Sequence, residues 1–416
     1  MIWTIARKEI ASNLLSYKFF VVLLLIVLLV ATSLFIMHHD FKLRMADYQV
    51  TRPKPGDPIA LVAPNPLSIF AKGLDDAMTR SFEISSIGID VRAGQVSGNI
   101  IYSFFTAPDF LYVVRVVLSL VALLFGFDQV SREREQGTLK LLLGSSVSRA
   151  KVLAGKWIGN FLSLTAPFLL VTILGAAILA LDRQVDFSAG HLGRLASIMG
   201  LSFLYLGFFL SLGMLISTLT RRAATSIVIL LFVWSLFVFI IPNLGTLLAR
   251  QFVALPSVHA LSEKQNQTWT REVLLSERGG NWRESVRTIS RDDDQMEQDY
   301  RPKFDRLVRL SRNINRLSPA ASFLDASSEI AGSGISAERH LRDEVLRYKD
   351  SIIAQILANW TIPKDSKPPF SSFAYKPRSL AEIFAAGALY DTAWLVFLNI
   401  LCFAGAYVAF IRYDAR

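Results

Sequence analysis

The sequence predicts an all-α membrane protein with six transmembrane helices, and three observations lead to this fold class. The chain of 416 residues is 52% hydrophobic and only 19% charged, and its mean hydropathy of +0.40 is too high for a soluble protein of this length. Six apolar runs are long enough to cross about 30 Å of hydrocarbon at about 1.5 Å per residue. Alternate short loops between them are rich in basic residues, so the basic loops share one side of the membrane, as is typical of multi-pass membrane proteins.

The six predicted spans cover residues 19–37, 111–127, 158–181, 195–219, 223–248 and 392–411. The first run is longer than the apolar part of a signal peptide and further spans follow it, so we expect it to be a retained anchor. Arg115 lies inside the second run, close to its outer end, where a long side chain can reach water. An Arg115 that faces a transported substrate is the alternative.

An amphipathic helix is predicted for residues 1–18, before the first span. Its apolar positions recur at helical spacing and are Ile2, Trp3, Ala6, Ile10 and Leu14. Its polar side carries Arg7, Lys8, Glu9, Ser12 and Asn13. Because the apolar face leads directly into a span, we expect this helix to lie in the membrane interface. A soluble helix packed on a cytosolic core is the alternative.

The distribution of charge predicts the orientation. The loop between spans two and three, residues 128–157, contains Arg132, Arg134, Lys140, Arg149, Lys151 and Lys156. The turn between spans four and five contains Arg221 and Arg222. Basic short loops face the cytoplasm, so both termini are predicted to lie there, in a protein of the cytoplasmic membrane. The same bias accounts for the net charge of +10 without a nucleic-acid partner.

Two long segments, residues 38–110 and 249–391, are predicted to lie outside. The first is rich in proline and alternates apolar and polar residues over 82–91, which indicates a loop with a short helix and some strand. The second is predicted to be mostly helical and to form a hairpin standing on the membrane. Its breaks are expected at Gly279-Gly280, at Ser318-Pro319, and within 332–334 and 363–377.

No catalytic machinery is predicted. A phosphate-binding loop requires Ser or Thr after its lysine and a glycine five positions before the Gly-Lys pair. Here Trp157 follows Gly155-Lys156, and Ala150 stands at the glycine position. We therefore expect no cofactor in this chain, and we expect ATP and Mg²⁺ to be bound by a partner subunit.

No metal site is predicted either. Met37, His38, His39 and Met45 could bind a soft metal, but interfacial histidines explain them more simply. Residues 292–294 are acidic but lack the spacing of a calcium loop. The single cysteine, Cys402, excludes an intrachain disulfide.

Polar residues inside the third span could line a substrate path. Asn160, Thr165 and Pro167 lie there, and a proline within a helix frees backbone carbonyl groups that other polar groups must satisfy. Together with Arg115 they are the candidate path residues. The small residues of the fourth span, including Gly200, indicate a helix-packing surface in preference to a pore lining.

The cytoplasmic loop resembles a known family. It is polar at its start, breaks at Gly137-Thr138 and then exposes an apolar run that a partner or the membrane must cover. It is similar to the first cytoplasmic loop of ABC-2-type transporter permeases at Glu133, Glu135, Gly137, Thr138, Leu139, Val147, Ser148, Arg149 and Gly155-Lys156. The turn 215–226 is similar to the second cytoplasmic loop of that family. The long outer segment resembles a subgroup broadly associated with multicopper-enzyme maturation.

The resemblance implies the permease subunit of an ABC exporter, in which the loop and the N-terminal helix dock on a cytosolic ATPase. It also implies a homodimer, or a pair with a sister permease. The residues expected to couple to the ATPase are Arg7, Lys8, Glu9, Glu133, Glu135, Gly137, Thr138, Leu139, Leu142, Arg149, Lys156, Arg221 and Arg222. Two alternatives remain: a mechanical or assembly module that transmits ATPase motion to envelope proteins without solute flux, and an intramembrane enzyme.

Overall fold

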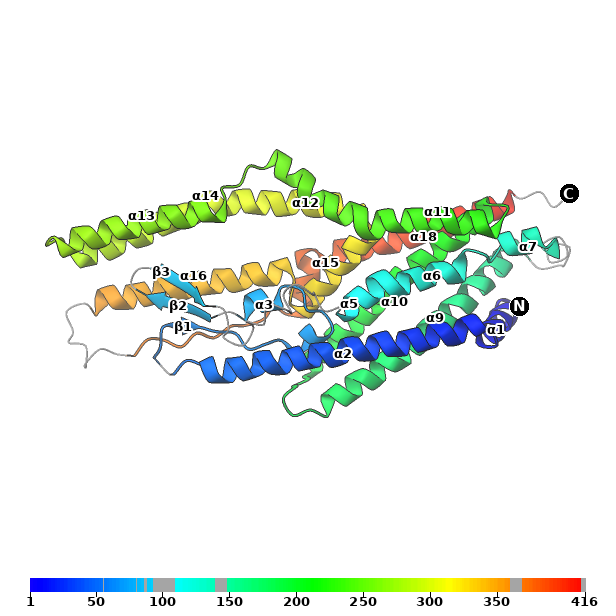
Figure 1. The fold of residues 1–416 in the computed structure, drawn as a ribbon, viewed down its shortest axis with the longest axis horizontal. Helices are drawn as coiled ribbons and strands as arrows, with labels where there is room; N and C mark the ends of the chain where they lie inside the picture. The colour runs from blue at the N-terminus through cyan, green and yellow to red at the C-terminus, as the bar shows by residue number, and fades with distance from the viewer. Residues whose placement is uncertain are drawn as a thin grey trace.

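The computed structural model describes residues 1–54, 56–79, 81–85, 88–92, 109–138, 148–359 and 369–412. The molecule is elongated, with a helical bundle at one end and a second domain at the other (Figure 1). Helices α1 (Ile2–Leu14) and α7 (Ser131–Glu135) lie at the far end of the bundle. A helical hairpin and a small sheet form the opposite end of the molecule.

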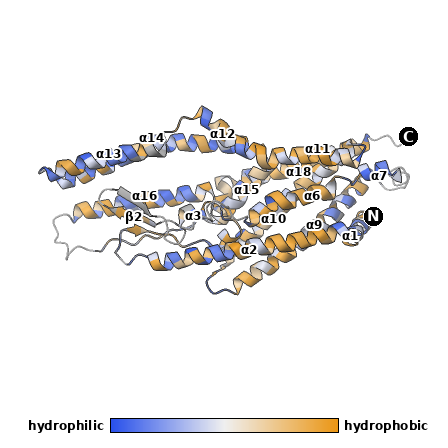
Figure 2. Cartoon of the chain, viewed as in Figure 1, coloured by the Kyte–Doolittle hydropathy of each residue, from blue (hydrophilic) through white to orange (hydrophobic). Residues whose placement is uncertain are grey.

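Within the described residues, six helical segments are long and apolar enough to cross a membrane, which confirms the predicted fold class. They are Tyr17–Thr51, Phe110–Glu135, Arg149–Ala180, Ala189–Leu219, Ala223–Phe252 and Leu380–Ile411. Apolar residues concentrate on these segments, and hydrophilic residues dominate the opposite end of the molecule (Figure 2). The bundle is therefore the part of the molecule that matches a lipid environment.

Several of these segments consist of more than one element. The first, third and fourth are single helices: α2 (Tyr17–Thr51), α9 (Arg149–Ala180) and α10 (Ala189–Leu219). The second contains α5 (Phe110–Tyr112), the π-helical η3 (Val113–Leu118) and α6 (Ser119–Gly126). The fifth contains α11 (Ala223–Ser235), the π-helical η4 (Leu236–Ile240) and α12 (Ile241–Phe252). The sixth contains α17 (Leu380–Ile383), the π-helical η6 (Phe384–Ala388) and α18 (Leu389–Ile411).

Helix α10 is the central helix of the bundle and packs against α6 and α18. A Cβ atom on Gly126 of α6 would lie 3.0 Å from the Cα atom of Gly213, so the two backbones are in direct contact. On the α18 side, the amide of Asn399 donates to the carbonyl of Leu204 at 2.8 Å. The prediction of a packing surface is confirmed at Gly213, whereas Gly200 meets nothing within 4 Å.

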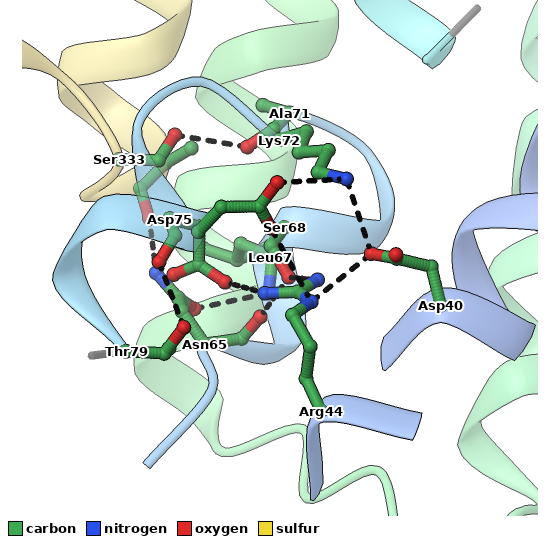
Figure 3. A network of polar contacts seen from close by, with 12 residues as sticks. Asp40, Arg44, Asn65, Leu67, Ser68, Ala71, Lys72, Asp75, Thr79 and Ser333 are labelled. Carbon is green, nitrogen blue, oxygen red and sulfur yellow. Dashed lines mark hydrogen bonds and ion pairs between the residues drawn. The ribbon is translucent and has the colours of Figure 1, made fainter. Parts of the chain in front are cut away.

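Helix α2 corrects the prediction for the first outer segment. The predicted span ended at residue 37, but the helix continues to Thr51 without a break. Arg44 of this extension is bound by Asp40, Asp75 and Ser68 and is only 7% exposed (Figure 3). Asp75 begins the short helix α3 (Asp75–Met78) and Ser68 lies in the 3-10 helix η1 (Pro66–Ile69).

The strand prediction in the same segment is confirmed. Strands β2 (Ser81–Ser85) and β3 (Gly88–Arg92) pair antiparallel, with Phe82 opposite Val91. The two-residue strand β1 (Ile59–Ala60) pairs with the other edge of β2, which gives the order β1-β2-β3. The sheet contributes to a small hydrophobic core shared with α16 (Ile335–Ala358).

The second outer segment is helical and breaks where the sequence predicts. Helix α13 (Val258–Glu277) and helix α14 (Trp282–Asn315) form a hairpin around Gly279-Gly280, and Gly279 has a positive φ of 96°. Helix α15 (Pro319–Ala331) begins after Ser318 and ends at Gly332, which adopts the left-handed conformation that favours glycine. Residues 369–379 contain no helix, and 360–368 lie outside the described residues.

Helix α15 connects the outer domain to the bundle. All but two of its 13 residues are buried, and the Phe323 ring stacks on Tyr205 of α10 with a centroid distance of 4.5 Å. At the start of α18, Asp391 is fully buried and accepts hydrogen bonds from Arg312 and Arg316, both at 2.7 Å. These contacts fix the end of α14 against the sixth spanning segment, near the start of α18.

The same cluster predicts a pH-dependent stability. Asp325 of α15 lies 3.8 Å from Arg312, but burial outweighs that attraction, and the carboxylates of Glu329 and Asp391 help to raise the pKa of Asp325 to about 6. A carboxyl whose pKa is raised on folding stabilises the folded state below its ordinary pKa, and this contribution is lost as the pH rises through about 6. Since Arg316 and solvent screen part of the effect, we expect stability to fall by about 1–2 kcal/mol between pH 4 and pH 7. Thermal unfolding of Asp325→Asn, which cannot ionise, should show a flatter pH profile than wild type, and equal slopes would contradict this assignment.

Candidate functional site

The bundle end that carries α1 is held together by close helix packing. Helix α1 lies against α9, where Gly155 and Gly159 face it one turn apart. A Cβ atom on Gly159 would lie 2.8 Å from the carbonyl oxygen of Ala6, and one on Gly155 would lie 2.8 Å from the Cβ atom of Ile5. Ala6 is fully buried in this contact. Small residues four apart thus allow α1 to approach the backbone of the third span.

A buried lysine joins three elements at this end. The Lys156 ammonium of α9 lies 2.7 Å from a carboxylate oxygen of Glu133 in α7 and 3.5 Å from one of Glu9 in α1. It also donates to the carbonyl of Gln129 at 3.1 Å. Lys156 is only 4% exposed. Because a buried ammonium requires compensating charge, the three elements form one unit.

A second set of contacts joins α1 to α9 further along. The amide of Asn13 donates to Asn160 at 2.9 Å and to the hydroxyl of Ser163 at 3.1 Å. Asn160 in turn donates to the carbonyl of Lys156 at 2.9 Å. The polar side of α1 therefore has protein partners at two positions, Glu9 and Asn13.

Helix α7 also caps the turn between the fourth and fifth spans. The Arg134 guanidinium donates to the carbonyls of Thr220 at 2.9 Å and Thr218 at 3.0 Å, at the C-terminal end of α10. The Ser217 hydroxyl accepts from the backbone N–H groups of Val130 and Ser131, both at 3.0 Å. A cationic group at a helix C-terminus satisfies free carbonyls and complements the helix dipole. Movement of α7 would thus act directly on α10.

Several polar groups at this end are exposed. Arg7 and Lys8 of α1 are exposed, and so are Arg221 and Arg222 in the turn before α11. Glu135, Gly137 and Thr138 are exposed as well. Gly137 follows the end of α7 with a φ of 74° and confirms the predicted break there. The arrangement is a ridge of charged side chains on a base that is tied to several spans.

A family model now assigns the chain. The model described as ABC-2 family transporter protein matches residues 3–415, which is nearly the whole chain. The chain belongs to this family. It is a multi-pass membrane protein of the class whose ATP hydrolysis is carried out by separate ATPase subunits.

Two curated permeases are similar to this ABC-2 family chain. One is the "Probable ABC transporter permease protein NosY" of Pseudomonas aeruginosa, which is 32% identical over 171 residues that make up 39% of this chain and 60% of the relative. The protein of the same name from Stutzerimonas stutzeri is 29% identical over 170 residues, with the same coverage. The chain spans about 60% of the length of the curated relatives it matches.

The structure divides the predicted coupling residues of this ABC-2 permease into two groups. Glu9 and Glu133 both bind Lys156, and Arg149 donates to the carbonyls of Phe410 and Ile411 at the end of α18. The residues that remain exposed are Arg7, Lys8, Glu135, Gly137, Thr138, Arg221 and Arg222. Leu139 and Leu142 lie outside the described residues.

The sequence placed Glu9 and Asn13 on the polar side of α1, and the structure corrects the expectation that this side is free of protein contacts. Both point toward α9, because Lys156 and Asn160 provide buried polar partners that the local hydropathy pattern does not reveal. Arg134 and Ser217 were not among the predicted site residues. The basic stretch around Arg134 was visible, but nothing local indicated that it would cap α10.

Each candidate path residue has local contacts in the structure. Asn160 is bound by Asn13, and the Thr165 hydroxyl donates to the carbonyl of Phe161 at 2.7 Å, one turn back on its own helix. Pro167 lies inside α9, which continues through it. The Arg115 guanidinium lies 5.8 Å from the centre of the Tyr112 ring. A role in a substrate path remains a prediction for these residues.

The alternative soft-metal site has a different explanation at His38. The His38 ring lies 3.0 Å from a carboxylate oxygen of Asp182, which also pairs with Lys42 at 2.6 Å. Hydrogen bonding by Lys42 and by the backbone N–H of Gln184 lowers the pKa of Asp182 to about 2. Across the described ranges, no group of three or more His, Cys, Asp or Glu side chains could hold a metal ion.

Alanine at Gly159 is expected to loosen α1. The added methyl group would lie 2.6 Å from the Cβ atom of Glu9, so the helices must separate, at a cost of about 1–3 kcal/mol. Gly200→Ala is the matched control, since it adds the same atom to a spanning helix where nothing lies within 4 Å. The measurement is the maleimide labelling rate of Ala6→Cys in a Cys402→Ala background. Faster labelling with Gly159→Ala only is the expected result, and unchanged rates would show that the packing tolerates the methyl group.

Proposed function

We propose that this chain is the permease subunit of an ABC-2-type exporter and that it couples ATP hydrolysis by a separate cytosolic ATPase to export across the cytoplasmic membrane. The observation that carries the proposal is the unit formed by α1, α7 and α9 around Lys156. Force applied to α1 or α7 is passed to the third span through Lys156 and to the fourth through the Arg134 contacts. A two-state rearrangement of the spans is the expected response.

We infer that the ATPase docks on the exposed ridge beside this unit. Arg7, Lys8, Arg221 and Arg222 supply positive charge there, and Glu135 supplies negative charge. The charge bias of the short loops supports a cytoplasmic location for this ridge and for both termini. A second permease chain, identical or related, would complete the membrane unit.

Charge reversal tests the docking site. Arg221→Glu combined with Arg222→Glu is expected to reduce co-purification of the ATPase at least tenfold, because like charges across an interface repel and exposed side chains leave the fold unchanged. The matched control is Lys303→Glu, an exposed basic residue on α14 at the other end of the molecule. Equal recovery of the ATPase with both variants would show that this turn is not part of the docking site.

Gly137→Pro tests the role of the cytoplasmic loop that follows α7. Proline fixes φ near −65°, whereas Gly137 has a φ of 74°, so the substitution must redirect the chain after α7. Among the described residues, no atom lies within 4 Å of the position of a Cβ on Gly137, so Gly137→Ala should weaken ATPase binding less than Gly137→Pro. Full ATPase binding with Gly137→Pro would show that the course of this loop does not matter for docking.

A mechanical role without solute flux is the second candidate. The fifth spanning segment runs through η4 into α12, which packs on α14, and Arg312 and Arg316 of α14 bind Asp391 of α18. Motion of the spans can therefore reach the outer hairpin. Reconstituted permease and ATPase distinguish the two roles: cargo accumulation inside inverted vesicles supports export, and stimulated ATPase activity without accumulation supports the mechanical role.

A further inference from the structure

An open hollow lies where α12 meets α14, outside the contacts described above. It has a volume of about 390 Å³ and is lined by Phe252, Arg306, Arg309, Leu310 and Asn313. The lining combines two apolar side chains with two guanidinium groups and one amide. Such a combination suits an amphiphile that has an apolar part and an anionic part.

The arginines of the hollow are available for a ligand. Within the described residues, neither Arg306 nor Arg309 forms an ion pair or a side-chain hydrogen bond, and both are exposed. The nearest acidic residue along α14, Asp305, pairs with Arg339 of α16 at 3.1 Å. Helix α12 contains no acidic residue and adds the exposed Arg250. Positive charge is therefore concentrated here without a compensating carboxylate.

An apolar stripe connects the hollow to the membrane span. Leu244, Leu247, Leu248 and Phe252 occur at helical spacing on α12 and are exposed, Leu247 to 61% and Phe252 to 71%. They continue the exposed apolar face of α11 and η4, which includes Phe232. Because that face belongs to a spanning segment, lipid is the environment that matches the stripe.

The length of the fifth segment sets the depth of the hollow in the bilayer. The segment Ala223–Phe252 has 30 residues and is about 45 Å long at about 1.5 Å per residue. A bilayer with both headgroup layers is about 40–45 Å thick. With Arg221 and Arg222 in one headgroup layer, Phe252 and the hollow fall in the other.

The hollow is held in shape by close packing on its protein side. A Cβ atom on Gly245 of α12 would lie 2.9 Å from the carbonyl oxygen of Ser311, so the two helices touch through their backbones. Ala249, Val253 and Leu307 form a small core beside the hollow. The arginines are thus presented from a fixed helix pair, which lowers the entropy cost of binding.

We propose that this hollow binds the headgroup of an anionic phospholipid, with Arg306 and Arg309 on the phosphate and the lipid chain along the α12 stripe. Under the orientation proposed above, this lipid belongs to the extracytoplasmic leaflet. Lipid bound here would tie the α12–α14 pair, and with it the outer hairpin, to the membrane surface. The proposal does not depend on ATPase docking or on the direction of transport.

Native mass spectrometry of the full chain purified in detergent tests this site. Phosphatidylglycerol and phosphatidylcholine with the same acyl chains are titrated against wild type and against Arg306→Gln/Arg309→Gln. The double variant is expected to retain phosphatidylglycerol about tenfold or more less well, since each basic residue near anionic lipid contributes a several-fold effect. Retention of phosphatidylcholine should be unchanged. Arg291→Gln, an exposed arginine elsewhere on α14, is the matched control and should behave as wild type.

Three results would overturn the proposal. The first is equal phosphatidylglycerol retention by wild type and the double variant. The second is equally tight binding of free glycerol phosphate, which would make the hollow a simple anion site. The third is a shift of the double variant from dimer to monomer with no change in lipid retention, which would assign the surface to a second copy of the chain.

Discussion

Replacing Lys156 by methionine is expected to destabilise the protein by about 2–4 kcal/mol and to uncouple it from its ATPase. The substitution leaves the carboxylates of Glu9 and Glu133 facing each other without the ammonium that lies between them. Breaking a buried ion pair by removing one partner costs about 3–5 kcal/mol, and the partial exposure of both carboxylates reduces that figure. The measurement is the thermal unfolding of the detergent-purified chain.

Two further variants make the Lys156 prediction specific. Lys151→Met changes an exposed lysine five residues earlier on the same helix and should leave stability within about 0.5 kcal/mol of wild type. Neutralising both carboxylates in the Lys156→Met background, with Glu9→Gln and Glu133→Gln, should recover part of the loss, because no unpaired charge remains. If Lys156→Met is as stable as Lys151→Met, the ammonium does not hold the three elements together.

The Lys156 unit also changes how Glu133 is to be interpreted. From the sequence, Glu133 was expected to be one of the residues that couple the chain to the ATPase. In the structure Glu133 contacts Lys156, so Glu133→Ala would act by freeing α7 from α1 and α9. Reduced ATPase binding of Glu133→Ala accompanied by reduced stability would indicate this indirect route, whereas Arg221 and Arg222 variants should reduce binding alone.

Features set by local sequence could be predicted, and contacts between distant segments could not. Six apolar runs indicate six spans, and the glycines at 279–280 and 332 mark helix ends, because these signals lie within a few residues of the structure they specify. Glu9 and Lys156 are far apart in the chain, and the residue pattern of α1 does not show that Glu9 will pair with a buried lysine. The polar partners of a helix face are a property of the folded bundle.

The end of α2 was not predicted correctly for the same reason. From His38 onward polar residues interrupt the apolar run, and hydropathy alone ends the span there. The helix continues because Arg44 meets Asp75 and Ser68, which come from a segment beyond a proline-rich stretch. The π-helical turns in the second, fifth and sixth segments likewise have no signature in the apolar pattern.

Replacing Arg44 by methionine is expected to detach the outer end of α2 from η1 and α3 and to cost about 3–5 kcal/mol. Asp75 is buried with Arg44 as its ionic partner, and the Ser68 hydroxyl loses the guanidinium that donates to it at 3.0 Å (Figure 3). Removal of the cation leaves a buried carboxylate without compensation. Arg52→Met, at the exposed end of α2, is the control and should have little effect.

A double-mutant cycle separates the charge from the packing in this network. Asp75→Leu in the Arg44→Met background removes the stranded carboxylate and should restore much of the stability, whereas a loss caused by packing alone would persist. Limited proteolysis between residues 54 and 74 reports whether η1 and α3 have left α2. If Arg44→Met is cleaved no faster than Arg52→Met, the network does not attach this segment. If it is cleaved faster while the double variant is protected, the ion pair is what makes the first span continue beyond the membrane as part of the outer domain.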